Sequence, residues 1–192
     1  MSKDVYVLAE QRDGNIQKVA FELVGEATKL AKDLNEQVVA ILLGDGVTAK
    51  AEELIQHGAD KVIVVDDPML AKYATEPYAK AITAIIKEFD PEIVLYGATS
   101  IGRDLAPRVS ARVHTGLTAD CTKLEIAEDT KLLNMTRPAF GGNIMATIVC
   151  KNHRPQMATV RPGVMAALAA DTARKGEVVP FKVEFTPADM NI

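Results

Sequence analysis

The sequence predicts an α/β protein with a doubly wound, mostly parallel sheet and additional antiparallel strands in its second half. Its first strand-like runs are apolar almost throughout, as in parallel strands that are covered on both faces. The segments between them carry apolar residues at helical spacing. After about residue 115 this alternation ends, and short β-like runs follow one another.

The first five elements alternate between strand and helix. We expect strands at 4–10, 37–44 and 61–67, since each is a short run rich in Val, Ile and Leu. The segment 16–34 is expected to be a helix, because four apolar residues recur there every three or four positions: Val19, Leu23, Ala27 and Leu30. The segment 47–58 is predicted to be a second helix that stops at a glycine.

The next three elements continue the pattern. The segment 75–89 is expected to be a helix with Thr75 as its N-cap and Pro77 in its first turn. The run 92–97 is a fourth strand, and 100–113 is a fourth helix. Parallel strands joined by helices require right-handed crossovers, and strands that are apolar throughout imply helices on both faces of the sheet.

The second half of the chain is expected to be mostly β-structure with antiparallel pairing. TKLEIAEDTKLLNMTRPA contains two β-like runs around Ala127–Thr130 and is typical of a hairpin. Three further runs are expected to be strands: NIMATIVCK, QMATVRPG and VVPFKVEF. No linker separates the halves, so we expect one domain over 1–192, with an α/β half at 1–115 and a β-rich extension at 116–192.

The composition excludes several classes of protein. A formal net charge of −4 argues against nucleic-acid binding. The sequence has no apolar run long enough to cross a bilayer, and acids interrupt its first apolar stretch, unlike a secretory signal. We therefore expect a cytoplasmic protein, or one of the mitochondrial matrix if the source is a eukaryote. The three histidines and two cysteines show no metal-ligand spacing.

The first motif is YGATSIGRDLAPRV, in which Gly97 and Gly102 have the spacing of a phosphate-binding loop. Such a loop continues with Lys and then Ser or Thr, whereas this one continues with Arg103 and Asp104. Asp104 offers no hydroxyl for Mg²⁺, and its charge repels phosphate. The motif also follows the fourth strand, while a mononucleotide site usually follows the first.

The same motif is also compatible with a plain helix start. Thr99 or Ser100 is a suitable N-cap, and Asp104 and Arg108 are spaced as a stabilising i, i+4 pair. The helix carries three arginines that are either solvated or face an acidic partner: Arg103, Arg108 and Arg112.

Two further motifs place arginines beside glycines at strand ends. RPAFGGN contains Arg137, Phe140, Gly142 and Asn143, and its glycines permit close approach of a backbone or a flat ligand. TVRPG ends a strand at Arg161, whose guanidinium suits a carboxylate, a phosphate or the electron-rich edge of a flavin. A plain hairpin turn and a surface ion pair are the respective alternatives.

The residues alone indicate no self-sufficient catalytic set. The sequence contains no G-x-S-x-G elbow, and its serines lack an adjacent histidine. Two readings stay open at this level: a stand-alone adenine-nucleotide-binding protein, and an enzyme that uses Cys121 or Cys150.

These motifs together resemble a known family. YGATSIGRDLAPRVSARVHTGLTADCTKLE, followed by RPAFGGNIMATIVCKNHRPQMATVRPG, is similar to the N-terminal domain of the electron transfer flavoprotein alpha subunit. The opening VYVLAEQRDGNIQKVAFELVGEATKLA resembles it too, so that the likeness covers nearly the whole chain.

The resemblance implies a nucleotide-binding fold of the adenine nucleotide alpha hydrolase type that holds no nucleotide of its own. Family members are heterodimers with a beta subunit and use FAD to carry electrons. They connect dehydrogenases, such as the acyl-CoA dehydrogenases of fatty acid β-oxidation, to a membrane quinone reductase, and some bifurcate electrons from NADH with two FADs. This chain is thus expected to be an electron carrier subunit and the base of the complex.

The resemblance also implies site residues and a missing part. Arg161 matches a position near the beta-subunit flavin or the subunit interface, and Arg137, Phe140, Gly142 and Asn143 match a turn that faces the same interface. The family's alpha subunit continues into a glycine-rich FAD-binding domain, whereas this sequence stops at Ile192. We therefore expect a fragment, an isolated domain or a natural short form, with FAD held in the full heterodimer and not by this chain alone.

Overall fold

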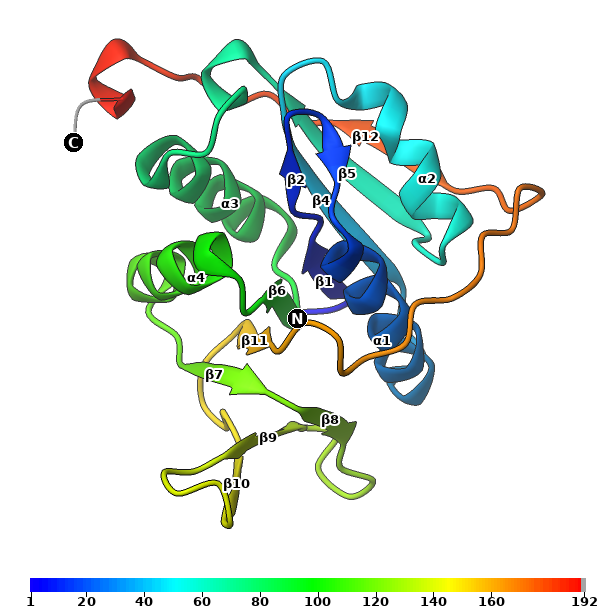
Figure 1. Cartoon of the computed structure of the whole chain (residues 1–192), viewed down its shortest axis with the longest axis vertical. Helices are drawn as coiled ribbons and strands as arrows, with labels where there is room; N and C mark the ends of the chain where they lie inside the picture. Colours follow the sequence, from blue (N-terminus) through cyan, green and yellow to red (C-terminus); the bar gives the residue numbers. More distant parts are fainter. Residues whose placement is uncertain (191–192) are drawn as a thin grey trace.

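The computed structural model describes residues 1–190 and confirms the predicted fold class (Figure 1). Its centre is a seven-stranded sheet in the order β12-β5-β4-β1-β6-β11-β7, and every pair of neighbours runs parallel. The strands are β1 (Val5–Leu8), β4 (Val38–Gly44), β5 (Lys61–Asp66), β6 (Ile93–Gly97), β7 (Leu117–Cys121), β11 (Gln156–Val160) and β12 (Glu177–Pro180).

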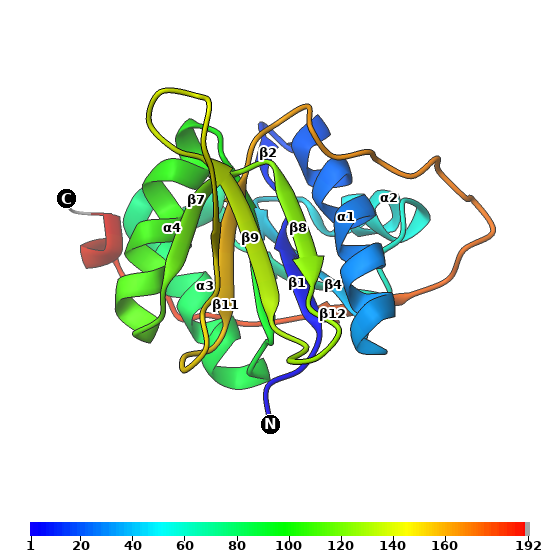
Figure 2. The same cartoon turned by 90° about the horizontal axis from the view of Figure 1, so that it is seen from below.

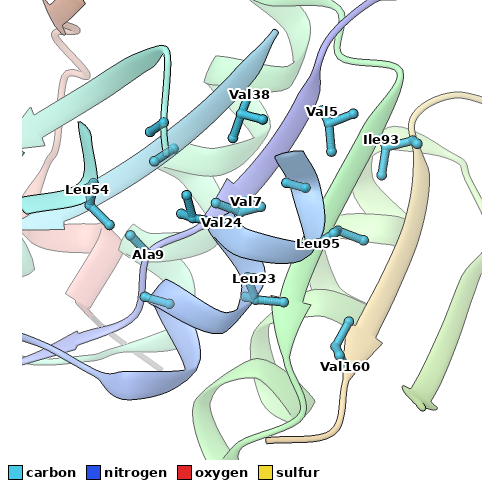
Figure 3. Close-up of a cluster of buried hydrophobic side chains, with 14 of the residues drawn as sticks. Val5, Val7, Ala9, Leu23, Val24, Val38, Leu54, Ile93, Leu95 and Val160 are labelled. Carbon is cyan, nitrogen blue, oxygen red and sulfur yellow. The ribbon is translucent and has the colours of Figure 1, made fainter. Parts of the chain in front are cut away.

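Helices cover both faces of this sheet, as doubly wound topology requires. They are α1 (Lys18–Leu34), α2 (Ala51–Gln56), α3 (Thr75–Phe89) and α4 (Ser100–Val113), with short 3₁₀ turns at Thr48–Lys50, Pro68–Leu70 and Pro187–Met190. The helices α1 and α2 share one buried apolar cluster with the sheet, and α3 and α4 share a second cluster on the opposite face. Figure 3 shows Leu23 and Val24 of α1 beside Val7 of the central strand.

A small antiparallel sheet extends the face that α1 covers. It consists of β8 (Lys123–Ile126), β9 (Leu133–Pro138) and β10 (Met145–Ile148), with β9 in the middle. Leu124, Leu133 and Met135 are buried in the same apolar cluster as α1. This arrangement confirms the predicted hairpin and the strand in NIMATIVCK, and Figure 2 shows the small sheet beside the main one.

The expected antiparallel pairing of the second half is wrong for the runs QMATVRPG and VVPFKVEF, and a strand that was not predicted, β7, is parallel as well. β7, β11 and β12 all join the main sheet in parallel. β11 inserts between β6 and β7, and all five of its residues are buried. A strand covered on both faces belongs inside a parallel α/β sheet.

Three local details also differ from the prediction. Ala74, rather than Thr75, is the N-cap of α3. Arg108 pairs with Glu76 of α3 instead of Asp104, and Arg112 binds the same glutamate. The predicted helix 47–58 divides into a 3₁₀ turn and the shorter α2.

Thr75 instead serves as a hydrogen-bond donor at the start of α3. Its Oγ1 donates to the Asp104 carboxylate at 2.6 Å, and the hydroxyl of Tyr73 donates to the same oxygen at 2.6 Å. Asp104 of the motif thereby joins α4 to the segment that leads into α3.

A second hairpin follows the first strand. β2 (Gln11–Arg12) pairs with β3 (Asn15–Ile16) through a two-residue turn in which Asp13 and Gly14 both have positive φ, +50° and +79°. The sequence analysis did not include this hairpin, which places Gln11 at the carboxyl end of the central strand.

Candidate functional site

The strand order reverses between β1 and β6. From β1 the chain proceeds to β4 and β5 on one side, and then returns to β6 on the other side of β1. In open α/β sheets, ligands bind outside the carboxyl ends of the strands at such a point. A ligand-binding site is therefore expected at the loops that follow β1 and β6.

Side chains of the protein itself occupy this crevice. Gln11 Nε2 donates to the carbonyl oxygen of Leu43 at 3.0 Å and contacts the Tyr78 hydroxyl at 3.2 Å. Tyr78 in turn donates to the carbonyl oxygen of Leu70 at 2.7 Å. The space that remains between these side chains and Ile101 is about 10 Å³, roughly what a single water molecule needs. This enclosed space is too small for the adenosine part of a nucleotide or of FAD. Two open hollows lie beside it along Gln11, one of about 280 Å³ toward Tyr73 and Ser100 and one of about 460 Å³ toward Asp45 and Lys50.

The Gly97–Gly102 motif serves helix packing at the same edge. A Cβ atom at Gly102 would overlap the carbonyl oxygen of Gly97, so α4 can start this close to β6 only with glycine there. Thr99 is the N-cap: its Oγ1 accepts from Gly102 N at 3.1 Å and donates to Glu10 at 2.6 Å. The geometry favours the interpretation of the motif as a helix start.

Backbone hydrogen bonds bring the first and third motifs together. Ala98 N donates to the carbonyl oxygen of Val160 at 2.7 Å, so the turn after β6 lies against the end of β11. Arg103 of α4 donates from Nε to the carbonyl oxygen of Ala98 at 3.0 Å. Arg161 N donates to the carbonyl oxygen of Cys121 at 2.9 Å, which joins the end of β11 to the end of β7.

Arg161 and Asp120 form a bidentate ion pair at this edge. Arg161 donates from Nε and Nη2 to the two carboxylate oxygens, at 3.1 and 2.7 Å. These bonds hold the pKa of the Asp120 carboxyl below its ordinary value, and the charges of Arg103 and Arg137 lower that pKa further. Arg161 is thus in contact with the carboxylate, while Arg103 and Arg137 act on it only through their charge. Within the described part of the chain, the buried Nε of Arg137 has no hydrogen-bond partner.

The other predicted site residues lie on the turn between β9 and β10. Gly141 and Gly142 both have positive φ, +92° and +74°, as the tight turn requires. Phe140 and Asn143 are exposed, and Phe140 has a relative exposure of 104%. Figure 2 shows the turn as a loop that projects beyond the strands.

The turn and strand that follow Arg137 carry no charged side chain over residues 138–150. Besides Phe140, the large apolar side chains of Ile144, Met145 and Ile148 are exposed here. We call residues 138–150 the uncharged edge. Arg137 directly precedes it in the sequence. We call Arg103, Arg137 and Arg161, whose charges act on Asp120, the arginine cluster.

The residue that the sequence analysis missed is Asp120. It stands in the stretch GLTADCT, which was part of the resemblance but received no role. Its only local signal is a charged residue directly before a buried cysteine. Its partner follows 41 residues later, so only the pairing of β7 with β11 brings the two together.

Within residues 1–190, neither the buried cysteine nor the metal-ligand side-chain types form a second site. Burial raises the pKa of the Cys121 thiol to about 11, the opposite of what a nucleophilic cysteine needs. Among residues 1–190, no group of three or more His, Cys, Asp or Glu side chains could hold a metal ion. Over the same residues, no helix is long and apolar enough to span a membrane.

These features define a doubly wound α/β domain in which Gln11 and Tyr78 fill the space at the end of the central strand, and an arginine-rich edge and an uncharged strand edge are exposed. The family assignment follows from comparison with known proteins. The electron transfer flavoprotein domain family matches residues 5–186, and this chain belongs to that family.

Relatives within this family are subunits of larger proteins. The chain is 54% identical over 188 residues to the electron transfer flavoprotein subunit alpha of Thermoanaerobacterium thermosaccharolyticum, covering 98% of this chain and 57% of that protein. The corresponding protein of Megasphaera elsdenii is 51% identical over 187 residues, with 97% and 55% covered. The lactate dehydrogenase (NAD(+),ferredoxin) subunit LctC of Acetobacterium woodii is 46% identical, with 95% and 43% covered. The chain thus spans about half the length of these relatives.

Proposed function

We propose that this chain is the docking domain of an electron transfer flavoprotein, which binds a beta subunit and supports electron transfer through FAD held in the full heterodimer. The observation that carries the proposal is the uncharged edge with an arginine cluster next to it. In this proposal the chain is an electron carrier subunit, not a self-sufficient enzyme, and it works in the cytoplasm as one domain over 1–192.

The uncharged edge is suited to binding another protein chain. β10 is one of the two outer strands of its sheet, with β9 as its neighbour. Natural edge strands are usually protected by charges, prolines or a covering element, because an exposed apolar edge invites pairing. Phe140 and Ile144 have relative exposures of 104% and 65%, and two such side chains form an anchor when a partner buries them.

The arginine cluster is suited to negative charge on a bound flavin. FAD would supply the electron-carrying chemistry when it is bound to the complex. Arg161 has a side chain that is 44% exposed and retains donors that Asp120 does not use. A guanidinium near an electron-rich ring edge favours the charged form of that ring. Arg137 adds positive charge from the side of the uncharged edge.

The wider role follows the family. We propose that the complex moves electrons between dehydrogenases of the acyl-CoA dehydrogenase type and downstream acceptors. The relative named as an NAD(+),ferredoxin lactate dehydrogenase subunit favours flavin-based electron bifurcation as a variant of this role.

A reconstitution experiment tests the proposal. The chain is mixed with a matching beta subunit and FAD, and complex formation is followed by gel filtration and by the flavin absorption spectrum. Phe140→Asp and Ile144→Asp are expected to weaken binding at least tenfold, because they place a charge in the proposed interface. Val178→Asp is the matched control, since Val178 is 40% exposed on β12, the opposite edge strand of the main sheet. No complex with the wild-type chain, or equal weakening by all three variants, would refute the docking role.

A stand-alone adenine-nucleotide-binding protein is the alternative function. The small space left between Gln11 and Tyr78 argues against an adenine bound there, and the match to the electron transfer flavoprotein domain family argues against a stand-alone protein. Calorimetry with ATP and AMP separates the two, and a dissociation constant below roughly 10 μM, about −7 kcal/mol, would favour the alternative.

A further inference from the structure

A β-bulge sets the position of Asp120. Ala158 of β11 lies opposite Thr118 and Val160 lies opposite Cys121, so that Ala119 and Asp120 together face Thr159. Asp120 has φ of +59°, a left-handed conformation that departs from the regular strand. Bulges of this kind redirect side chains next to functional sites.

The backbones on both sides of the Asp120–Arg161 pair are held in place. Asp120 N donates to Thr159 Oγ1 at 2.8 Å, and Arg161 N donates to the carbonyl oxygen of Cys121 at 2.9 Å. Most surface ion pairs contribute little because two mobile side chains must be ordered to form them. Here the two main chains are already fixed, and the bidentate geometry adds directional specificity.

The pair determines which donors of Arg161 face outward. The Asp120 carboxylate engages Nε and Nη2. A guanidinium has five N–H donors in a rigid plane, so its remaining edge keeps donors for a ligand. Without Asp120, Arg161 would lose the two hydrogen bonds that fix this orientation.

We propose that Asp120 is a positioning residue that holds the Arg161 guanidinium with one donor edge toward an anionic group of the partner's flavin. This inference rests on the proposed function and adds to it a residue that acts only through Arg161. The balance of three guanidinium groups and one carboxylate leaves the cluster cationic, as an anionic group requires.

The first test uses the 192-residue chain alone and needs no flavin. The exchange of the Arg161 Nε–H with solvent is measured by NMR. Asp120→Asn is expected to accelerate this exchange several-fold, and Asp120→Glu is expected to restore slow exchange in part. Glu125→Gln is the control, because the exposed side chain of Glu125 pairs with Lys123 on β8 and its loss removes the same unit of charge. Unchanged exchange in Asp120→Asn, with circular dichroism showing an intact fold, would overturn the positioning role.

The second test uses the reconstituted complex with the beta subunit and FAD and measures the reduction potential of the bound flavin. Arg161→Ala is expected to lower the potential. If Asp120 acts by positioning, Asp120→Asn shifts the potential in the same direction, and the double variant equals Arg161→Ala alone. If Asp120 contributes only its charge, Asp120→Asn raises the potential and the two effects add, which would overturn the inference.

The two proposals fail in different ways. If Arg161→Ala leaves the potential unchanged, the flavin role of the cluster is wrong, and the NMR exchange measurement still decides whether Asp120 positions Arg161. If Arg161→Ala shifts the potential while Asp120→Asn does not, the proposed function stands and the role of Asp120 is wrong.

Discussion

Replacing Gly102 by Ala tests whether close packing explains the glycine pair of the first motif. The new Cβ would overlap the carbonyl oxygen of Gly97, where real Cβ contacts stay beyond 3.0 Å. The obstacle is backbone and cannot rotate away, so the start of α4 would have to retreat by more than about 1 Å. That movement also strains the Thr99 cap, whose Oγ1 accepts from Gly102 N at 3.1 Å.

Two opposing contributions decide the size of the effect. Ala stabilises a helix relative to Gly by about 1 kcal/mol. Overpacking of a tight contact costs about 1–3 kcal/mol, and this contact is near the upper end because neither backbone can yield alone. The expected net loss is about 2 kcal/mol, which in a chain of this size lowers the melting temperature by about 4–8 °C.

The assay is urea unfolding followed by circular dichroism, with calorimetry for the melting temperature. Gly116→Ala is the matched control, because its Cβ would meet the Cys150 Sγ at an ordinary 3.7 Å; it should change stability by less than about 0.5 kcal/mol. If Gly102→Ala is as stable as the wild type, the contact between α4 and the end of β6 does not require glycine, and the packing interpretation of the motif is wrong.

Two further predictions concern ionisable groups. Hydrogen bonds from Thr75 and Tyr73 hold the pKa of Asp104 below its ordinary value, so its stabilising contribution is present above the unfolded-state pKa of about 3.9 and is lost as the pH falls through the folded-state pKa. Asp104→Asn should therefore reduce the loss of urea stability below pH 4, and an unchanged pH dependence would contradict this reasoning. Burial raises the pKa of Glu26, and the ion pair with Lys29, at 3.6 Å, offsets this rise only in part. Glu26→Gln should therefore raise the melting temperature at pH 7. A lower melting temperature would show that the ion pair stabilises the fold by more than the burial of the charge costs.

The regular elements were predictable because their signals are local. The predicted helices 75–89 and 100–113 have the observed bounds, since their apolar spacing lies within one stretch of sequence and, for 100–113, so does the hydroxyl N-cap Thr99. The hairpin at residues 11–16 had a readable signal in its Asp-Gly dipeptide, which favours a two-residue turn with positive φ. Because no hairpin was predicted there, Gln11 received no role in the sequence analysis.

The strand order and the site geometry depend on distant residues and were not predictable in this way. Nothing local in QMATV distinguishes an outer antiparallel strand from one inserted between β6 and β7. The arginines Arg137 and Arg161 were found from their neighbours in sequence, whereas Asp120 acquires its meaning only from the bulge that pairing with β11 creates. Whether Phe140, Gly142 and Asn143 face a partner stays a prediction.

The insertion of β11 also constrains how the chain can be made. β7 joins the main sheet only through β11. The ribosome synthesises β11 after β7 and after all three strands of the small sheet. Until Gln156 emerges, β6 has an open hydrogen-bonding edge, and β7 has no place in the main sheet. Such edges are where nascent chains associate wrongly. We therefore expect an interval during synthesis in which β1, β4, β5 and β6 are paired while β7 and the small sheet have not yet joined the main sheet. Chaperone binding to the nascent chain should be strongest in that interval.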